Sequence, residues 1–175
     1  EKRFMLTFQK GEHNESISAL DRDFIETQLG RPPRGLEAVA VRNASGQPAV
    51  IRVASLVDDK PFPTLFWLVD AHINYQLDQL EAAGEIARLQ EQVDASSELQ
   101  ITLAANHRAY IKLRDQLMTA EIRQSLIDRG YWESLSNKGV GGIGDFTRIR
   151  CLHTWYAAHL VRSNAIGELL EEGDL

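Results

Sequence analysis

Cysteine is almost absent from this chain: Cys151 is the only one among 175 residues. A single cysteine cannot form an internal disulfide, which fits a reducing compartment. No apolar run approaches the ~20 residues that a membrane-spanning helix needs. The first sixteen residues have too short an apolar core for a secretory signal. We therefore expect a cytoplasmic protein with no membrane partner.

An excess of positive charge is also missing. The chain has 19 Lys and Arg against 25 Asp and Glu, which gives a formal net charge of −6. The basic clusters are short, Arg31 with Arg34 and Arg148 with Arg150. Nucleic-acid binding needs a clustered basic face that neutralises phosphates. We expect no nucleic-acid partner.

The composition is that of an ordinary globular protein, with 43% hydrophobic and 25% charged residues. A chain of this size buries roughly 70% of its unfolded surface and needs neither disulfide nor metal to fold. We expect a flexible N-terminal segment over residues 1–17, one domain over 18–167 and an acidic C-terminal tail over 168–175.

The first half of the chain predicts one helix and three strands. Ser18 is a good helix N-cap, and Gly30 followed by two prolines ends that helix. Alternating apolar residues over 36–42 and 48–55, joined by a polar turn, predict a β-hairpin. After a loop, 56–63, the apolar run 65–70 predicts a third strand.

The second half predicts helices. Helical spacing begins at Ala71, and Gly84 bends or interrupts that helix. Ser96 or Ser97 caps a long helix that runs to about Asp128, and a final helix covers 149–161. The fold class is therefore α+β, a small antiparallel β-sheet of about three strands covered by several helices.

Five short segments occur in an order that resembles the bacterial domain-of-unknown-function family 501. They are LGRPPRG (29–35), PFPTLFWL (61–68), QLEAAG (79–84), HRAYIKLR (107–114) and RCLH (150–153). The family has no assigned biochemical role. Its actinobacterial members are encoded near septum-formation-initiator and exopolyphosphatase-like genes, so the resemblance implies, at most, a scaffold in the division or envelope machinery.

The resemblance also implies a degenerate metal site. Many members have Cys-x-Cys-Gly where this chain has Asn43 and Ser45, a further cysteine where it has Asp70, and the cysteine that is retained here as Cys151. Four thiolates suit a closed zinc site, whereas neutral amide and hydroxyl oxygens are poor zinc ligands. We expect a hydrogen-bonded polar cluster, no bound metal and no other cofactor. The sequence leaves open whether the four positions meet.

The segment around Cys151 contains two histidines. If 149–161 is helical, Cys151, Trp155 and His159 lie on one stripe, with Cys151 and His159 about 12 Å apart along the axis. Cys151 and His153 then point to nearly opposite sides, unless Cys151 precedes the helix. This spacing argues against a chelate, and packing is favoured over a nucleophilic role for Cys151.

Two other constellations suggest an anion site. His107, Tyr110 and Arg114 share one helical face, and this group is able to bind a carboxylate or phosphate. Residues 139–146 contain four glycines and precede Arg148 and Arg150, so their amides are free to approach an anion. A polar stripe packed against another helix and a flexible connector are the competing interpretations.

The leading hypothesis is a binding or interaction module whose polar pocket takes an anionic small molecule or an acidic protein partner. The pocket would be lined by His107, Tyr110, Arg114, Arg148, Arg150 and His153.

The alternative is a hydrolase or transferase acting on a phosphorylated small molecule, with His107 or His153 as general acid or base. The sequence shows no complete triad or catalytic carboxylate pair. Whether the protein is an enzyme and how it oligomerises stay open.

Overall fold

The expected α+β class is confirmed by the computed structural model, which describes residues 9–10, 16–173 and 175. Within these residues an antiparallel sheet has the strand order β1-β2-β3-β6. Most of the predicted flexible segment 1–17 lies outside the described residues, and its residues 9–10 form β1. The strands are β1 (Gln9–Lys10), β2 (Leu36–Arg42), β3 (Pro48–Val53) and β6 (Phe66–Leu68).

The predicted hairpin is confirmed. β2 and β3 pair with Val39 opposite Ile51, and β6 pairs with β3 with Trp67 opposite Ile51. The segment expected to be a loop contains a small second hairpin of β4 (Leu56–Val57) and β5 (Lys60–Pro61). Its turn needs two residues with positive φ, and Asp58 and Asp59 supply them at 50° and 62°.

α1 lies between β1 and β2 in the sequence, and all the other helices come after β6. Their bounds are α1 (Ala19–Leu29), α2 (Ala71–Ala82), α3 (Glu85–Asp94), α4 (Ser97–Leu117), α5 (Ala120–Asp128), α6 (Trp132–Ser136), the 3-10 turn η1 (Val140–Gly142), α7 (Leu152–Val161) and α8 (Ala165–Gly173). The predicted helix start and the predicted break are confirmed: the Ser18 hydroxyl accepts the Asp21 amide, and Gly84 has a φ of 88° between α2 and α3. The tail expected over 168–175 begins inside α8, where Leu170 is buried.

The single long helix expected to reach Asp128 is wrong. Met118 adopts an extended conformation, and the Thr119 side chain accepts the Ile122 amide at 3.3 Å to start α5. A threonine at an N-cap satisfies an amide that has no partner in the helix, so the chain gains by restarting there.

The helix expected from residue 149 begins later, at Leu152. The Gln90 side chain donates to the Thr147 carbonyl at 2.8 Å and accepts the Ile149 amide at 2.9 Å. These two bonds fix the backbone at Thr147 and Ile149, and the helix does not begin before Cys151, whose φ is −150°. Cys151 is therefore the N-cap residue of α7, and this changes what its side chain can reach.

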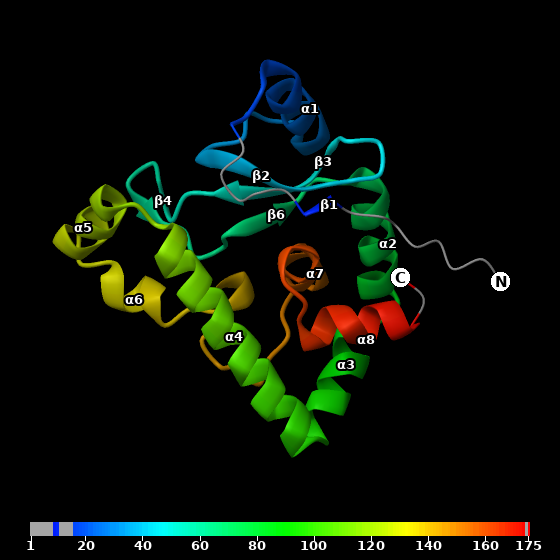
Figure 1. Ribbon diagram of the computed structural model, residues 1–175. Helices are drawn as coiled ribbons and strands as arrows, with labels where there is room; N and C mark the ends of the chain where they lie inside the picture. Colours follow the sequence, from blue (N-terminus) through cyan, green and yellow to red (C-terminus); the bar gives the residue numbers. More distant parts are fainter. Residues whose placement is uncertain (1–8, 11–15, 174) are drawn as a thin grey trace.

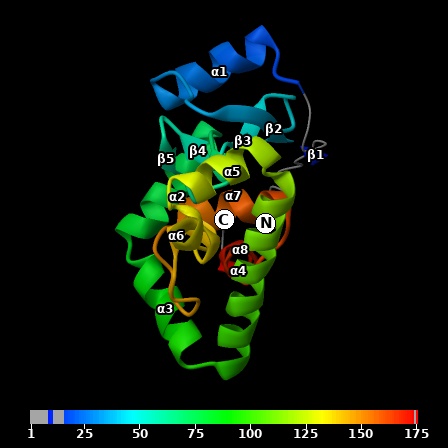
Figure 2. The ribbon, with the colours of Figure 1, turned by 90° about the vertical axis from the view of Figure 1, so that its left-hand side faces the viewer.

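The sheet separates two hydrophobic clusters (Figures 1 and 2). α1 covers one face, where Ile25 packs with Ile51 and Val53. The other face rests on α7, which lies at the centre of the molecule with α2 and α4 on either side of it in Figure 1. Every residue of α7 from Trp155 to Val161 is buried. Its N-terminus is the part that reaches the surface, because Cys151 and His153 are half-buried.

Among the described residues, no helix is both long enough and apolar enough to cross a membrane.

Candidate functional site

The predicted polar face of α4 is turned into the core. Arg114 is fully buried and donates to the Pro63 carbonyl at 2.9 Å and the Leu135 carbonyl at 2.8 Å. The Tyr110 hydroxyl accepts the Leu65 amide at 2.6 Å. Burial raises the pKa of Tyr110 to about 12 and lowers that of Arg114. Through these bonds Tyr110 and Arg114 fix the 63–65 segment and α6 to α4, while the Arg114 Nε has no hydrogen-bond partner among the described residues.

His107 is also fully buried. Its Nδ1 accepts the Val140 amide at 3.1 Å, and its ring stacks on Phe146 at 4.7 Å between centroids. Burial lowers the pKa of His107 to about 4, although the charge of Asp145 acts in the opposite direction. The histidine is therefore neutral at pH 7 and anchors η1 to α4.

This burial predicts a loss of stability in acid. The unfolded chain protonates His107 near its ordinary pKa of 6.5 and the folded chain only near 4, so stability is complete above pH 6.5 and falls as the pH drops towards 4. The cost reaches about 3 kcal/mol at about 1.4 kcal/mol per pKa unit. Urea unfolding of the wild type and of His107→Asn at pH 7.5 and 4.5 tests this. Asparagine keeps an acceptor near the Nδ1 position but cannot be protonated. Equal pH dependence in both proteins would contradict the assignment.

Arg148 and Arg150 lie apart from His107, Tyr110 and Arg114 on α4. Both are exposed, and they alternate along an extended segment with buried Ile149 and half-buried Cys151. Side chains alternate between the two faces of an extended backbone, so the arginines point away from the Cys151 side. The six residues of the predicted pocket thus lie in three places: the buried face of α4, the exposed side of the 148–150 segment, and the start of α7.

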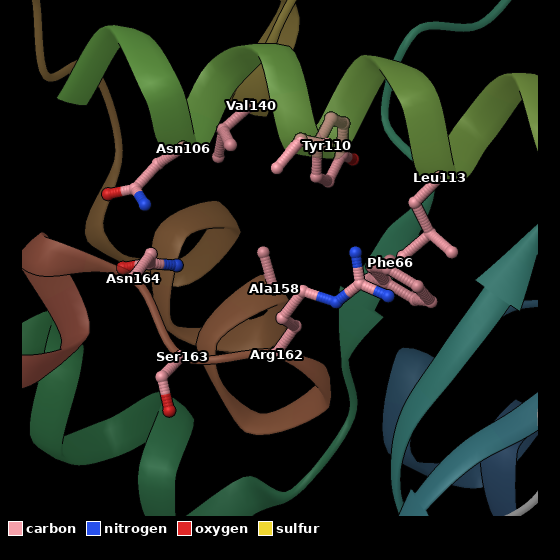
Figure 3. Close-up of a pocket in the computed structure, with 10 residues that line it drawn as sticks. Phe66, Asn106, Tyr110, Leu113, Val140, Ala158, Arg162, Ser163 and Asn164 are labelled. Carbon is pink, nitrogen blue, oxygen red and sulfur yellow. The ribbon is translucent and has the colours of Figure 1, made fainter. Parts of the chain in front are cut away.

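The structure has a small hollow between α4 and the α7–α8 turn (Figure 3). Its lining is mainly apolar, and Arg162 is its one charged residue. The side-chain oxygens of Asn106 and Asn164 already accept the amides of Ala165 and Gly167. The hollow therefore offers few free polar groups to a ligand.

The positions of the implied zinc cage do not all meet. The Asn43 amide lies 3.4 Å from the Asp70 carboxylate, and the Asn43 side-chain oxygen accepts the Ser45 amide at 3.0 Å. Asp70 caps α2 through the Ile73 amide. Cys151 contacts the opposite end of α2, about 16 Å further along its axis at about 1.5 Å per residue.

Four other side chains meet where the end of α2 packs against the start of α7; we call them the α2–α7 cluster, made of Asp78, Glu81, Cys151 and His153. His153 Nδ1 lies 3.7 Å from Cys151 Sγ and 3.2 Å from Glu81 Oε1. His153 Nε2 lies 3.0 Å from Asp78 Oδ1. The Leu152 amide, at the start of α7, donates to Glu81 Oε1 at 2.7 Å and fixes that carboxylate.

The cluster is both reachable and electrostatically polarised. The side chains of His153 and Glu81 are 23% and 28% exposed. The hydrogen bond with Cys151, its charge and that of Glu81 together raise the pKa of His153 to about 9, against the opposing effect of burial. Burial and Glu81 raise the pKa of Cys151, but the hydrogen bonds from His153 and from the Thr154 backbone outweigh them, so it ends below its usual value. Cys151 and His153 thus shift each other's pKa in opposite directions.

The sequence pattern pointed to Cys151 and His153 as candidate site residues, but Asp78 and Glu81 were not predicted. A signal was present, because residues three apart on a helix share a face and Glu81 lies in the QLEAAG segment. What concealed the cluster was the assumption that the last helix includes Cys151. With Cys151 in extended conformation, its side chain turns towards His153.

A family model described as "Protein of unknown function (DUF501)" matches residues 39–172. The chain belongs to the DUF501 family. The match includes all of the α2–α7 cluster and excludes α1. No curated protein and no solved structure matches the DUF501 chain.

Proposed function

We propose that this DUF501 protein is a binding module whose ligand is a cation held by the α2–α7 cluster. The observation that carries the proposal is the meeting of His153 Nδ1, Glu81 Oε1 and Cys151 Sγ within 4.8 Å of one another. In the free protein a proton on Nδ1 bridges it to Glu81 Oε1 at 3.2 Å. A cation that takes the place of this proton is held by the same atoms, because metal binding displaces protons from its ligands.

The charges around the cluster support the same conclusion. Two carboxylates and a thiol surround one imidazole. An anion placed here would meet negative charge, whereas a cation is attracted to it. The anionic guest expected from sequence would have to use other residues, because His107, Tyr110 and Arg114 are engaged inside the fold.

A thermal-unfolding screen tests the proposal. Zinc, calcium and magnesium chlorides, spermidine and sodium phosphate are each added to the full chain. A ligand at 100 times its Kd stabilises the folded state by about 2.7 kcal/mol, so a true ligand gives a clear rise in Tm. At least one cation should raise the Tm. Glu81→Gln should reduce this rise, whereas Glu91→Gln, at an exposed position of α3, should leave it unchanged. A rise with phosphate alone would favour the anion hypothesis and overturn this one.

A thiol-dependent hydrolase or transferase is the second candidate. Cys151 Sγ lies 3.7 Å from His153 Nδ1, and His153 Nε2 lies 3.0 Å from Asp78 Oδ1. This is the order of a nucleophile, a base and a carboxylate that orients the base. Glu81 weakens this arrangement, because its carboxylate competes for the Nδ1 proton and repels the thiolate. The negative charge of Glu81 also disfavours a phosphorylated substrate. Rapid alkylation of Cys151 by iodoacetamide that is lost in His153→Gln would support this candidate, and alkylation at the rate of a free thiol in both proteins would remove it.

A further inference from the structure

We infer that the cation is a divalent transition metal ion, best matched by zinc, bound by Glu81, Cys151 and His153 with its fourth coordination position open. The inference rests on the proposed cation-binding function and names its ligand. It differs from the four-cysteine cage that the family resemblance implies, since it uses one thiolate, one imidazole and one carboxylate.

Two of the three distances between the ligand atoms match those expected around one ion. Zinc bonds are about 2.3 Å to sulfur and about 2.0–2.1 Å to nitrogen and oxygen, so tetrahedral geometry separates sulfur from nitrogen by about 3.6 Å and nitrogen from oxygen by about 3.3 Å. The corresponding distances here are 3.7 Å from Sγ to Nδ1 and 3.2 Å from Nδ1 to Oε1. All three atoms lie within 4.8 Å of one another. An ion would replace the Nδ1 proton between these atoms.

The surroundings orient the three ligands. Asp78 accepts the Nε2 proton of His153, the carboxylate–histidine–metal arrangement that typically fixes a ligating histidine. The Leu152 amide holds Glu81, and Cys151 precedes the first turn of α7, where partial positive charge favours a thiolate. Each ligand is therefore positioned by a contact of its own.

The ligand types select among metals. Calcium and magnesium prefer six or more oxygen ligands, and the cluster has too few. Thiolate with imidazole and carboxylate suits zinc and its neighbours in the transition series. One thiolate and one carboxylate neutralise the ion, so the site needs no further charged ligand.

The open position follows from the number of ligands and their exposure. Within the described part of the chain, the metal-ligating group has three members, and Asp78 is engaged by the far nitrogen of His153. Structural zinc sites are closed by four protein ligands, whereas sites with three keep a position for water or substrate. The three ligands are half-buried, so water can reach the ion. The site is therefore of the type that binds an exogenous ligand.

The first experiment loads the chelator-treated full chain with Co²⁺ and Zn²⁺. Native mass spectrometry should show one ion per chain, and Co²⁺ should give a thiolate-to-metal charge-transfer band with the intense visible bands of tetrahedral cobalt. These readouts need no variant. A sub-stoichiometric ion or an octahedral spectrum without the charge-transfer band would overturn the inference.

Variants then assign the ligands by competition with a chromogenic chelator. Cys151→Ala and His153→Ala should weaken zinc binding by more than about 100-fold, and Asp78→Asn by about 10–100-fold as an outer partner of a ligand. His72→Gln is the matched control, an exposed histidine on the same helix, and should change nothing. Wild-type affinity in Cys151→Ala would overturn the assignment.

Azide added to the cobalt protein tests the open position. A change in the visible bands with retention of the charge-transfer band is expected, and an unchanged spectrum would show a closed site.

Different results would overturn the metal inference and the cation-binding function. Stabilisation by spermidine without any bound metal would overturn this inference and leave the cation-binding function standing, whereas no response to any cation would remove both.

Discussion

Arg114→Ala should lower the free energy of unfolding by about 4 kcal/mol. The guanidinium is fully buried and supplies the donors for the Pro63 and Leu135 carbonyls. Each carbonyl left without a donor costs about 1–3 kcal/mol, and the deleted side chain adds a cavity. For a domain of this size, about 4 kcal/mol corresponds to a fall in Tm of roughly 8–16 °C. Urea unfolding followed by circular dichroism measures the change.

Two further variants separate the causes of this loss. Lys112→Ala removes an exposed cation two residues away on α4 and should cost less than about 0.5 kcal/mol. Arg114→Lys keeps the charge but has one ammonium group in place of a fork with two arms, so it should restore only part of the stability. If Arg114→Ala unfolded like the wild type while losing an anionic ligand, Arg114 would belong to a binding site, as the sequence first indicated.

Gly167→Ala should destabilise the protein by about 3 kcal/mol, although alanine is the better helix former by about 1 kcal/mol. A Cβ at this position would overlap the imidazole of His159, which faces it from α7. His159 has no room to move, because its Nδ1 accepts the Asn164 amide at 3.0 Å and its Nε2 lies 3.2 Å from Glu171. Either α8 separates from α7 or these contacts break, and overpacking of this kind costs about 1–3 kcal/mol or more.

Gly173→Ala provides the control for this prediction. It makes the same substitution in the same helix, but nothing lies within 4 Å of the added Cβ. Its effect on the unfolding free energy should be neutral or slightly stabilising. Equal responses of the two variants would mean that the approach of α8 to His159 is not what limits residue 167.

Local signals were enough to predict much of the fold. Ser18 and Gly30 delimit α1 because a hydroxyl cap and a left-handed glycine act within one turn of the chain. The β2–β3 hairpin follows from alternation around a polar turn. Gly84 separates α2 from α3 by its positive φ. In each case the deciding interaction lies within a few residues in the sequence.

The candidate site could be predicted only in part. The sequence drew attention to Cys151 and His153 but favoured packing for Cys151. It gave the two side chains nearly opposite directions unless Cys151 precedes the helix, and that second alternative is the one the structure shows. It grouped His107, Tyr110 and Arg114 correctly on one face, but a helical face by itself does not reveal whether it is turned to solvent or to the core. Here it is turned inward, where backbone groups of distant loops use its donors and acceptors.

By itself, the sequence determined the fold class, the hairpin and the helix ends that depend on local caps. Only the tertiary structure decided where α7 begins and which groups surround Cys151. The physical reason is that Gln90 on α3 binds the backbone of Thr147 and Ile149, and Glu81 on α2 accepts the Leu152 amide. These bonds join residues about sixty to seventy positions apart, and they form only when the packing of α2, α3 and α7 brings the backbone and side chains together.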